Sequence, residues 1–188
     1  MNETHLQYLA SDDWAAKLDA DLLPWIERVA DLGDDVLEVG PGPGLTTDIL
    51  RRRAEKVTAI EFDHALAVTL ADRLRGTSVD VIEGDAGAMD FDSDRFSAVT
   101  AFSVLHHIPT AAEQDRVLAE MLRVLAPGGG LFATDARDID FIRDAHHDDT
   151  FVPLPAGTLV ARLETIGFSD VQLEIADYEL RVSARKLG

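Results

Sequence analysis

The apolar and polar positions of this chain alternate between two periods. Short, nearly continuous apolar runs, typical of buried strands, lie at residues 36–39, 57–63, 79–83, 96–102 and 130–135. Between them, apolar residues recur every three or four positions and predict helices over 45–53, 64–74 and 110–125. Strands that alternate with helices predict a parallel sheet with helices on both faces, which is the α/β class.

A helical segment precedes the first strand. Apolar residues recur at helical spacing after Asp12, and Pro24 predicts a kink or a break among them. Gly33 ends this segment, which covers residues 1–33. The chain therefore begins with helical structure that lies outside the alternation of strands and helices.

The last third of the chain is less regular. Residues 136–157 follow the fifth strand at the carboxyl edge of the sheet, where open α/β sheets bind ligands, and we expect them to face the substrate. A helix over 158–166 comes next. Two alternating runs, 171–175 and 178–186, then predict an antiparallel hairpin.

Three glycines at alternate positions directly follow the first strand. They are Gly40, Gly42 and Gly44, and a helical pattern starts at Leu45. Glycine adopts positive φ and lets a ligand approach the main chain closely. The start of a helix offers N–H groups and a positive dipole end. A small ligand with a polar or anionic part is therefore expected over Gly40 to Gly44.

The spacing of these glycines distinguishes between ligands. A dinucleotide turn, G-x-G-x-x-G, would have glycine at Leu45, and a phosphate loop would continue with Gly-Lys-Ser/Thr. The run from Glu38 to Gly44, Glu-Val-Gly-Pro-Gly-Pro-Gly, instead resembles the E/D-x-G-x-G-x-G signature of the class I S-adenosylmethionine (SAM) methyltransferases.

Acidic residues end the next two strands. A carboxylate at Glu61 can accept both hydroxyls of a ribose, a role common to SAM and NAD folds. The exit of the third strand, Gly84-Asp85-Ala86, resembles the methyltransferase motif whose aspartate accepts from the adenine amino group while the next N–H donates to the ring. An ionised aspartate can only accept, which matches an exocyclic amine.

The fourth strand, 96–102, continues into Ser103-Val-Leu-His-His-Ile-Pro109. This run resembles the small-molecule methyltransferases of the ubiquinone/menaquinone-biosynthesis type (methyltransferase type 11-like), as does the R-x-L-x-P-G-G-x-L run from Arg123. The (D/N/S)-P-P-(Y/F/W) segment usual in enzymes that methylate amino groups of nucleic acids is absent from this position.

The resemblance covers roughly residues 35–187 and implies one SAM-binding domain over 1–188. Its fold is a doubly wound, mostly parallel, Rossmann-like sheet of seven strands with a C-terminal antiparallel hairpin. Residues 8–14 are then either a lid over the cofactor or simple packing on the sheet. The implied cofactor residues are Glu38, which organises the ammonium group, and Gly40, Pro41, Gly42, Gly44, Glu61, Phe62, Asp85, Ala86, Phe102 and Ser103.

The implied reaction is methyl transfer from SAM to a small-molecule acceptor, with S-adenosylhomocysteine as the product. A base is needed only where the acceptor carries a proton that must leave, and the candidates are His106, His107, His146 and His147, of which the first two are the catalytic prediction. Asp135, His146 and His147 are expected on the substrate side. We predict no metal at the 146–149 run, because adjacent residues rarely converge on one ion without a ligand from elsewhere.

The composition and net charge of the chain limit the classes of partner that we expect. The chain has 188 residues, 46% of them hydrophobic, which suits one domain. A formal charge of −18 disfavours nucleic acid and anionic membranes, and the basic run 51–53 fits a solvated helix end. The sequence has no cysteine, which fits the cytoplasm, and its first residues resemble neither a secretion signal nor a membrane span. No periodicity indicates an oligomeric state.

Two alternatives remain at this point. An NAD-dependent oxidoreductase would use Glu61 in the same way, although Leu45 and the absence of a Tyr-x-x-x-Lys pair argue against it. A regulatory or scaffold protein could keep the SAM pocket without catalysing a reaction. A nicotinamide titration and a turnover screen separate these alternatives from the methyltransferase.

Overall fold

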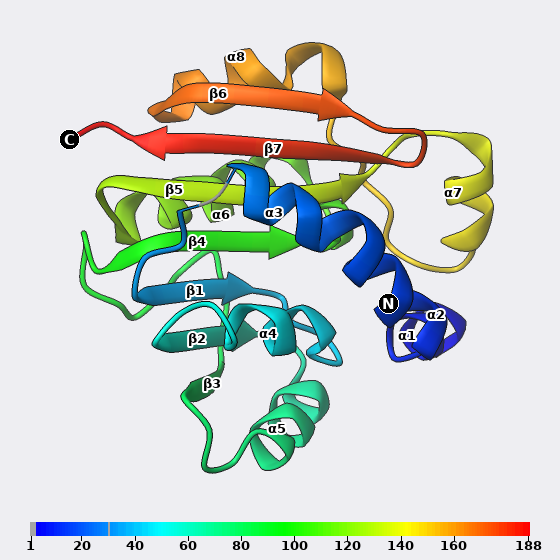
Figure 1. Ribbon diagram of the computed structural model, residues 1–188. Helices are drawn as coiled ribbons and strands as arrows, with labels where there is room; N and C mark the ends of the chain where they lie inside the picture. The colour runs from blue at the N-terminus through cyan, green and yellow to red at the C-terminus, as the bar shows by residue number, and fades with distance from the viewer. Residues whose placement is uncertain (1–2, 30) are drawn as a thin grey trace.

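The computed structural model describes residues 3–29 and 31–188 and contains a seven-stranded sheet in the order β3-β2-β1-β4-β5-β7-β6 (Figure 1). The strands are β1 (Asp35–Val39), β2 (Lys56–Glu61), β3 (Val79–Glu83), β4 (Phe96–Phe102), β5 (Leu125–Ala136), β6 (Phe168–Ile175) and β7 (Glu179–Lys186). All neighbouring pairs are parallel except those of β7, which lies antiparallel between β5 and β6. The predicted mostly parallel sheet and its C-terminal hairpin are confirmed.

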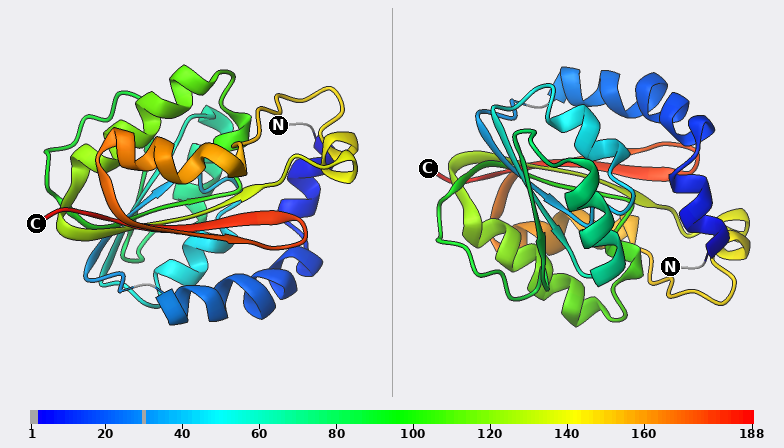
Figure 2. Two further views of the ribbon diagram at one scale, coloured as in Figure 1. Left: turned by 90° about the horizontal axis from the view of Figure 1, so that it is seen from above. Right: turned by 90° about the horizontal axis from the view of Figure 1, so that it is seen from below.

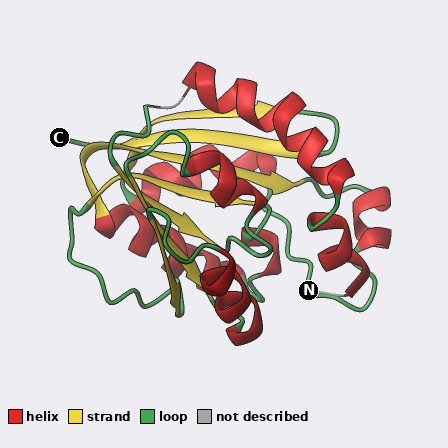
Figure 3. Ribbon diagram, turned by 60° about the horizontal axis from the view of Figure 1, so that its bottom comes forward, coloured by secondary structure: helices red, strands yellow, loops and turns green. Residues whose placement is uncertain are grey.

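Helices cover both faces of the twisted sheet (Figures 2 and 3). They are α1 (Glu3–Leu9), α2 (Asp12–Lys17), the π-helical turn η1 (Leu18–Leu22), α3 (Leu23–Val29), α4 (Leu45–Leu50), α5 (His64–Arg73), the 3₁₀ turn η2 (Leu105–His107), α6 (Ala111–Val124), α7 (Asp140–Ala145) and α8 (Ala156–Ile166). One core forms between the sheet and α3, α4 and α5, and the other between the sheet and α6 and α8. Within the described residues, no helix combines the length and apolar character needed to cross a membrane.

The N-terminal helical run passes Pro24 without breaking. Proline has no N–H, and its ring clashes with the carbonyl four residues earlier in an α-helix. The turn before Pro24 is π-helical, and the N–H of Leu23 donates to the carbonyl of Leu18, five residues back. The wider turn accommodates the proline ring, so the predicted kink or break is replaced by a π-helical insertion.

Several boundaries differ from the sequence prediction by a few residues, and the reason is clearest where α6 meets β5. Helix α6 ends at Val124, because the last carbonyls, of Arg123 and Val124, accept from the N–H groups of Asp94 (3.1 Å) and Arg95 (2.9 Å). Strand β5 therefore starts before Pro127. The region 136–157, expected to be irregular, contains the short helix α7.

Candidate active site

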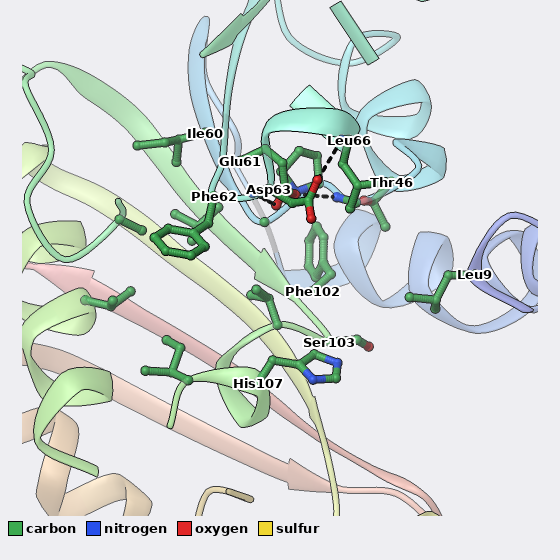
Figure 4. Close-up of a pocket in the computed structure, with 18 of the residues that line it drawn as sticks. Leu9, Thr46, Ile60, Glu61, Phe62, Asp63, Leu66, Phe102, Ser103 and His107 are labelled. Atoms are coloured by element: carbon green, nitrogen blue, oxygen red, sulfur yellow. Dashed lines mark hydrogen bonds between the residues drawn. The ribbon is translucent and has the colours of Figure 1, made fainter. Parts of the chain in front are cut away.

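A cavity of about 640 Å³ opens at the carboxyl ends of the parallel strands. It lies where the strand order reverses between β1 and β4, the position at which open α/β sheets bind ligands. Its walls come from the turns after β1, β2, β3 and β4, from the start of α6 and from the N-terminal helices (Figure 4). Its volume is within the roughly 300–1,000 Å³ usual for small-ligand sites.

The turn after β1 requires glycine at all three positions. Gly40, Gly42 and Gly44 have φ of +65°, +53° and +84°, which L side chains rarely adopt. A Cβ on Gly40 would lie 2.3 Å from a methyl carbon of Val104, and one on Gly44 would lie 2.3 Å from Leu70. No atom lies within 4 Å of the corresponding position at Gly42. Gly40, Gly42 and the intervening proline line the cavity, whereas Gly44 packs against α5 behind it.

Strand β2 ends in Glu61, which is 7% exposed and lines the cavity (Figure 4). Its carboxylate accepts from the N–H of Gly42 and from the N–H of Asp63, both at 3.0 Å. Asp63 in turn caps α5 through its side chain. A carboxylate has about four acceptor positions, so two backbone donors leave capacity for a ligand. Glu61 is therefore held in place beside the open space at Gly42 and can accept two further donors.

Another wall combines an exposed ring with a carboxylate. Phe62 is 79% exposed and lines the cavity, as do Asp85 and Ala86 after β3. Asp85 accepts from the N–H of Gly87 at 2.7 Å and lies 4.0 Å from the guanidinium of Arg116. An aromatic face next to an acceptor suits a heteroaromatic ring that carries an amino group.

Glu38 lies inside the fold, at 1% exposure, and is not among the residues that line the cavity. The hydroxyl groups of Thr46 and Thr47 donate to its two carboxylate oxygens. Burial, opposed by these two hydrogen bonds, raises the pKa of Glu38 to about 7. Its expected link to an ammonium group stays a prediction, and any such link runs from beneath the glycine turn.

Glu38 is expected to make the stability of the protein fall as the pH rises from 5 to 8. Its ordinary pKa is 4.5, so the folded state binds more protons than the unfolded state between about pH 4.5 and 7. The contribution of protonated Glu38 is complete below pH 4.5 and is lost as the pH rises through 7. In Glu38→Gln the loss of unfolding free energy over this interval should be smaller by about 2 kcal/mol.

Urea unfolding at pH 5 and pH 8 measures this difference. Glu55→Gln is the matched control, because Glu55 is exposed and the substitution is chemically identical. The control should follow the wild type at both pH values. The same pH dependence in wild type and Glu38→Gln would contradict the assignment.

The end of β4 forms the opposite side of the cavity. Phe102 and Ser103 line it, and the N–H of Ser103 donates to the carbonyl of Thr134 at 2.8 Å. Ser103 has φ of +55°, which costs a non-glycine residue roughly 1–2 kcal/mol. Figure 4 shows Ser103 and His107 together on one side and Glu61 on the other. Of the four candidate bases, His107 is the one that lines the cavity.

His106 lies in a buried polar cluster behind this wall, at 1% exposure. Its ring Nδ1 contacts one carboxylate oxygen of Asp135, and its backbone N–H donates to the other at 3.1 Å. Its Nε2 lies 3.1 Å from Nε2 of His146, whose pKa is lowered by burial. Asp135 and His146, expected on the substrate side, thus contact His106 and are not among the cavity-lining residues. His147 is exposed and lies beside Asp148.

The N-terminal helices contribute part of the wall. Leu6 and Leu9 of α1 and Trp14 of α2 line the cavity, and the ring of Tyr8 packs 5.4 Å from that of Trp14. Both helices lie at the end of the sheet where the parallel strands terminate (Figure 1). This placement is consistent with either sequence interpretation, and the lid stays a prediction.

Several lining residues were not predicted from the sequence. Leu6 and Leu9 had a signal, the i, i+3 spacing of an amphipathic helix. Glu113 and Arg116 of α6 had none, since their pattern is that of a solvated helix face. Val104, in contrast, lines the cavity beside Ser103, as the resemblance implies, and closes the space behind Gly40.

Carboxylates dominate the charges of the wall. Among the described residues, Glu61, Asp63, Asp85 and Glu113 line the cavity, against the single guanidinium of Arg116. A wall with this charge attracts cations and repels phosphates.

Residues 37–133, about half of the chain, match the family model described as "Methyltransferase domain". A "Probable ribosomal RNA small subunit methyltransferase A" from Thermococcus onnurineus is 48% identical over 67 residues, 35% of this chain and 25% of that protein. A demethylmenaquinone methyltransferase from Thermobifida fusca is 35% identical over 102 residues, 53% of this chain and 42% of that protein.

The chain thus spans about a quarter of the length of the ribosomal RNA methyltransferases that it matches. A crystal structure of a SAM dependent methyltransferase from Aquifex aeolicus superimposes with a TM-score of 0.77 at 18% identity, covering 100% of both chains, and shows the same fold. The predicted fold and the predicted methyltransferase family are confirmed, and the family match decides against the NAD-dependent oxidoreductase. The chain belongs to the methyltransferase-domain family, as its glycine turn and its Ser103–Pro109 run indicate.

Proposed function

We propose that this protein transfers a methyl group from SAM to a small acceptor that is uncharged or cationic. The observation that carries the proposal is the open space at Gly42 beside the Glu61 carboxylate, in a cavity with a mostly acidic wall. The sulfonium and ammonium groups of SAM suit such a wall, whereas the two phosphates of a dinucleotide do not.

Each wall would hold one part of the cofactor. Glu61 would accept from the ribose hydroxyls, and Phe62, Asp85 and Ala86 would hold the adenine. The main chain at the glycine turn, together with the end of β4, would receive the methionine part.

The residues of this chain mainly align the acceptor and exclude water. Bound SAM supplies a methyl group that its sulfonium already activates, so no protein nucleophile is required. Leu6, Leu9 and Trp14 cover one side of the cavity with apolar surface. Where the acceptor carries a proton that must leave, His107 is the candidate base on the wall.

Charge favours a small acceptor over RNA. Within the described residues, most lysines and arginines form ion pairs with acidic side chains, as in Arg28–Glu174, Arg73–Asp48 and Lys186–Asp94. Phosphate binding needs basic side chains available to the backbone of the nucleic acid, and the chain is acidic overall. The absence of cysteine supports the cytoplasm as the compartment of the reaction.

The test has two stages. Calorimetric titration with S-adenosylhomocysteine should show binding below millimolar concentrations, and its absence would overturn the proposal. Release of S-adenosylhomocysteine from SAM is then followed with a panel of phenols, quinols, thiols and amines, and with a ribosomal RNA fragment. Turnover of a small molecule supports the proposal. Turnover of RNA alone overturns the acceptor class, and binding without any turnover favours a regulatory protein.

A further inference from the structure

Three imidazoles face one another behind the side of the cavity that carries Ser103 and His107, which we call the acceptor side. They belong to His106 and His107 on η2 and to His146 at the end of α7. Their ring centroids are 4.1 to 5.4 Å apart, and one nitrogen from each ring lies within 4.8 Å of those of the other two. The sequence predicts no metal at 146–149 because no further ligand is in sight, and the fold supplies two such ligands from η2.

An oxygen that can only accept lies against Nδ1 of every ring. The partner is the Asp135 carboxylate for His106, the Thr150 carbonyl (3.1 Å) for His107 and the Ile142 carbonyl (2.7 Å) for His146. Each Nδ1 therefore carries a proton, and in a neutral ring the lone pair is on Nε2. The Nε2 atoms of His106 and His146 are 3.1 Å apart, so two nitrogens that can act as metal ligands lie next to each other.

Buried negative charge surrounds the same rings. Asp135 is 2% exposed and contacts His106, and the 4% exposed side chain of Asp149 has an oxygen 3.8 Å from Nδ1 of His107. Both carboxylates accept backbone hydrogen bonds, Asp135 from His106 and Ala136 and Asp149 from Thr150, and a nearby cation would stabilise their charge further. A divalent cation among three neutral imidazoles supplies two positive charges for the two carboxylates.

We propose that His106, His107 and His146 bind one divalent transition-metal ion, with zinc as the expected metal. Carboxylate and carbonyl oxygens on the opposite ring nitrogens orient the ligands in sites of this kind. Zn–N bonds of about 2.0–2.1 Å place tetrahedral ligand nitrogens roughly 3.3 Å apart. The pair at 3.1 Å is already close to this spacing, and the third ring, with a nitrogen within 4.8 Å of the other two, would have to move toward them on binding.

The surrounding segment is fixed in place. The N–H of Val152 donates to the carbonyl of His106 at 2.8 Å. The buried side chain of Gln114 donates to the carbonyls of Leu105 and Val152 at 3.1 and 2.7 Å. The loop that carries His146 is therefore tied to the turn that carries the other two ligands.

The position of His107 decides how the ion is reached. His107 lines the cavity, whereas His106 and His146 lie behind it, so a fourth ligand comes from the acceptor side. An acceptor with a hydroxyl or thiol group would then coordinate the metal, which lowers the pKa of that group. This last step rests on the proposed function, while metal binding itself does not. With the ion bound, His107 is a ligand and not a free base.

The test is zinc titration of the full chain, freed of any affinity tag and stripped with chelator. Wild type should bind one zinc per chain, measured by calorimetry and elemental analysis. His146→Ala should weaken binding by at least about 100-fold, and Asp135→Asn by about 10- to 100-fold. His147→Ala is the matched control, because His147 follows His146 in the sequence but its side chain is exposed. This variant should bind zinc like wild type.

Two results would overturn the metal site. One is a wild-type protein that takes up no zinc from micromolar solution, which leaves a proton between the rings. The other is equal zinc binding by wild type and His146→Ala. Titration of metal-free wild type with S-adenosylhomocysteine keeps the two proposals apart. Cofactor binding without zinc binding rejects only the metal site, and zinc binding without cofactor binding rejects only the methyltransferase. The wild-type titration also decides the matter if a variant fails to fold.

Discussion

Replacing Glu61 by alanine is expected to lower the affinity for S-adenosylhomocysteine by about 100-fold or more. Hydrogen bonds to a charged group contribute roughly 1.5–3 kcal/mol each, and the ribose would lose two of them. The variant also removes the acceptor for the N–H groups of Gly42 and Asp63, which hold the turn beside the ligand. Calorimetric titration measures the affinity, and urea unfolding checks that the fold survives.

Glu83→Ala is the control for this variant. Glu83 pairs in register with Glu61 at the end of the neighbouring strand and has a half-exposed side chain that contacts His64. It is not among the cavity-lining residues, so its loss should leave the affinity unchanged. Unaltered affinity in Glu61→Ala would refute the placement of the ribose.

Adding one methyl group at Gly42 is expected to weaken the binding of the cofactor. The space beyond its Cα is open in the protein, so Gly42→Ala causes no clash with other residues, but it fills part of the cavity. Overpacking by a methyl group costs roughly 1–3 kcal/mol, which corresponds to about a 10- to 100-fold loss of affinity. The positive φ of +53° adds a separate stability cost of about 1–2 kcal/mol.

Gly76→Ala separates the two effects. Gly76 has φ of +81°, and no atom lies within 4 Å of its Cβ position, so the backbone strain is similar. It lies between α5 and β3 and is not among the cavity-lining residues. Both variants should lose similar stability by urea unfolding, and only Gly42→Ala should lose affinity by calorimetry. An equal loss of affinity in both variants would show that strain, and not occupied space, is responsible.

The sequence predicts most of this fold because its strong signals are local. Buried strands appear as apolar runs, and the three glycines after β1 are readable since only glycine adopts their backbone angles without strain. The π-helical turn before Pro24 was not predictable in the same way. A proline in a helical pattern allows a kink, a break or an insertion, and packing selects among them.

The site residues follow the same rule: those placed by the sheet topology could be predicted from the sequence, and those placed by packing could not. Glu61 and Asp85 follow strands of a parallel sheet, so the topology alone brings them to one edge. Glu38 lies at the end of β1, where the sequence predicts it, but it is buried and hydrogen-bonded to two threonines of α4. A sequence motif does not show whether its residues are buried. His146 and His106 are 40 positions apart in the sequence, and their contact depends on how the chain folds back after β5, which no local pattern fixes.

The two tryptophans of the chain lie in unlike surroundings, which gives the protein an internal optical probe. Trp14 is on the cavity wall, whereas Trp25 is 2% exposed and its indole N–H donates to Glu174 at 3.3 Å. A molecule entering the cavity changes the polarity around the first indole and leaves the surroundings of the second unchanged. Emission from a Trp25→Phe variant would therefore report occupancy directly, without a dye or a label.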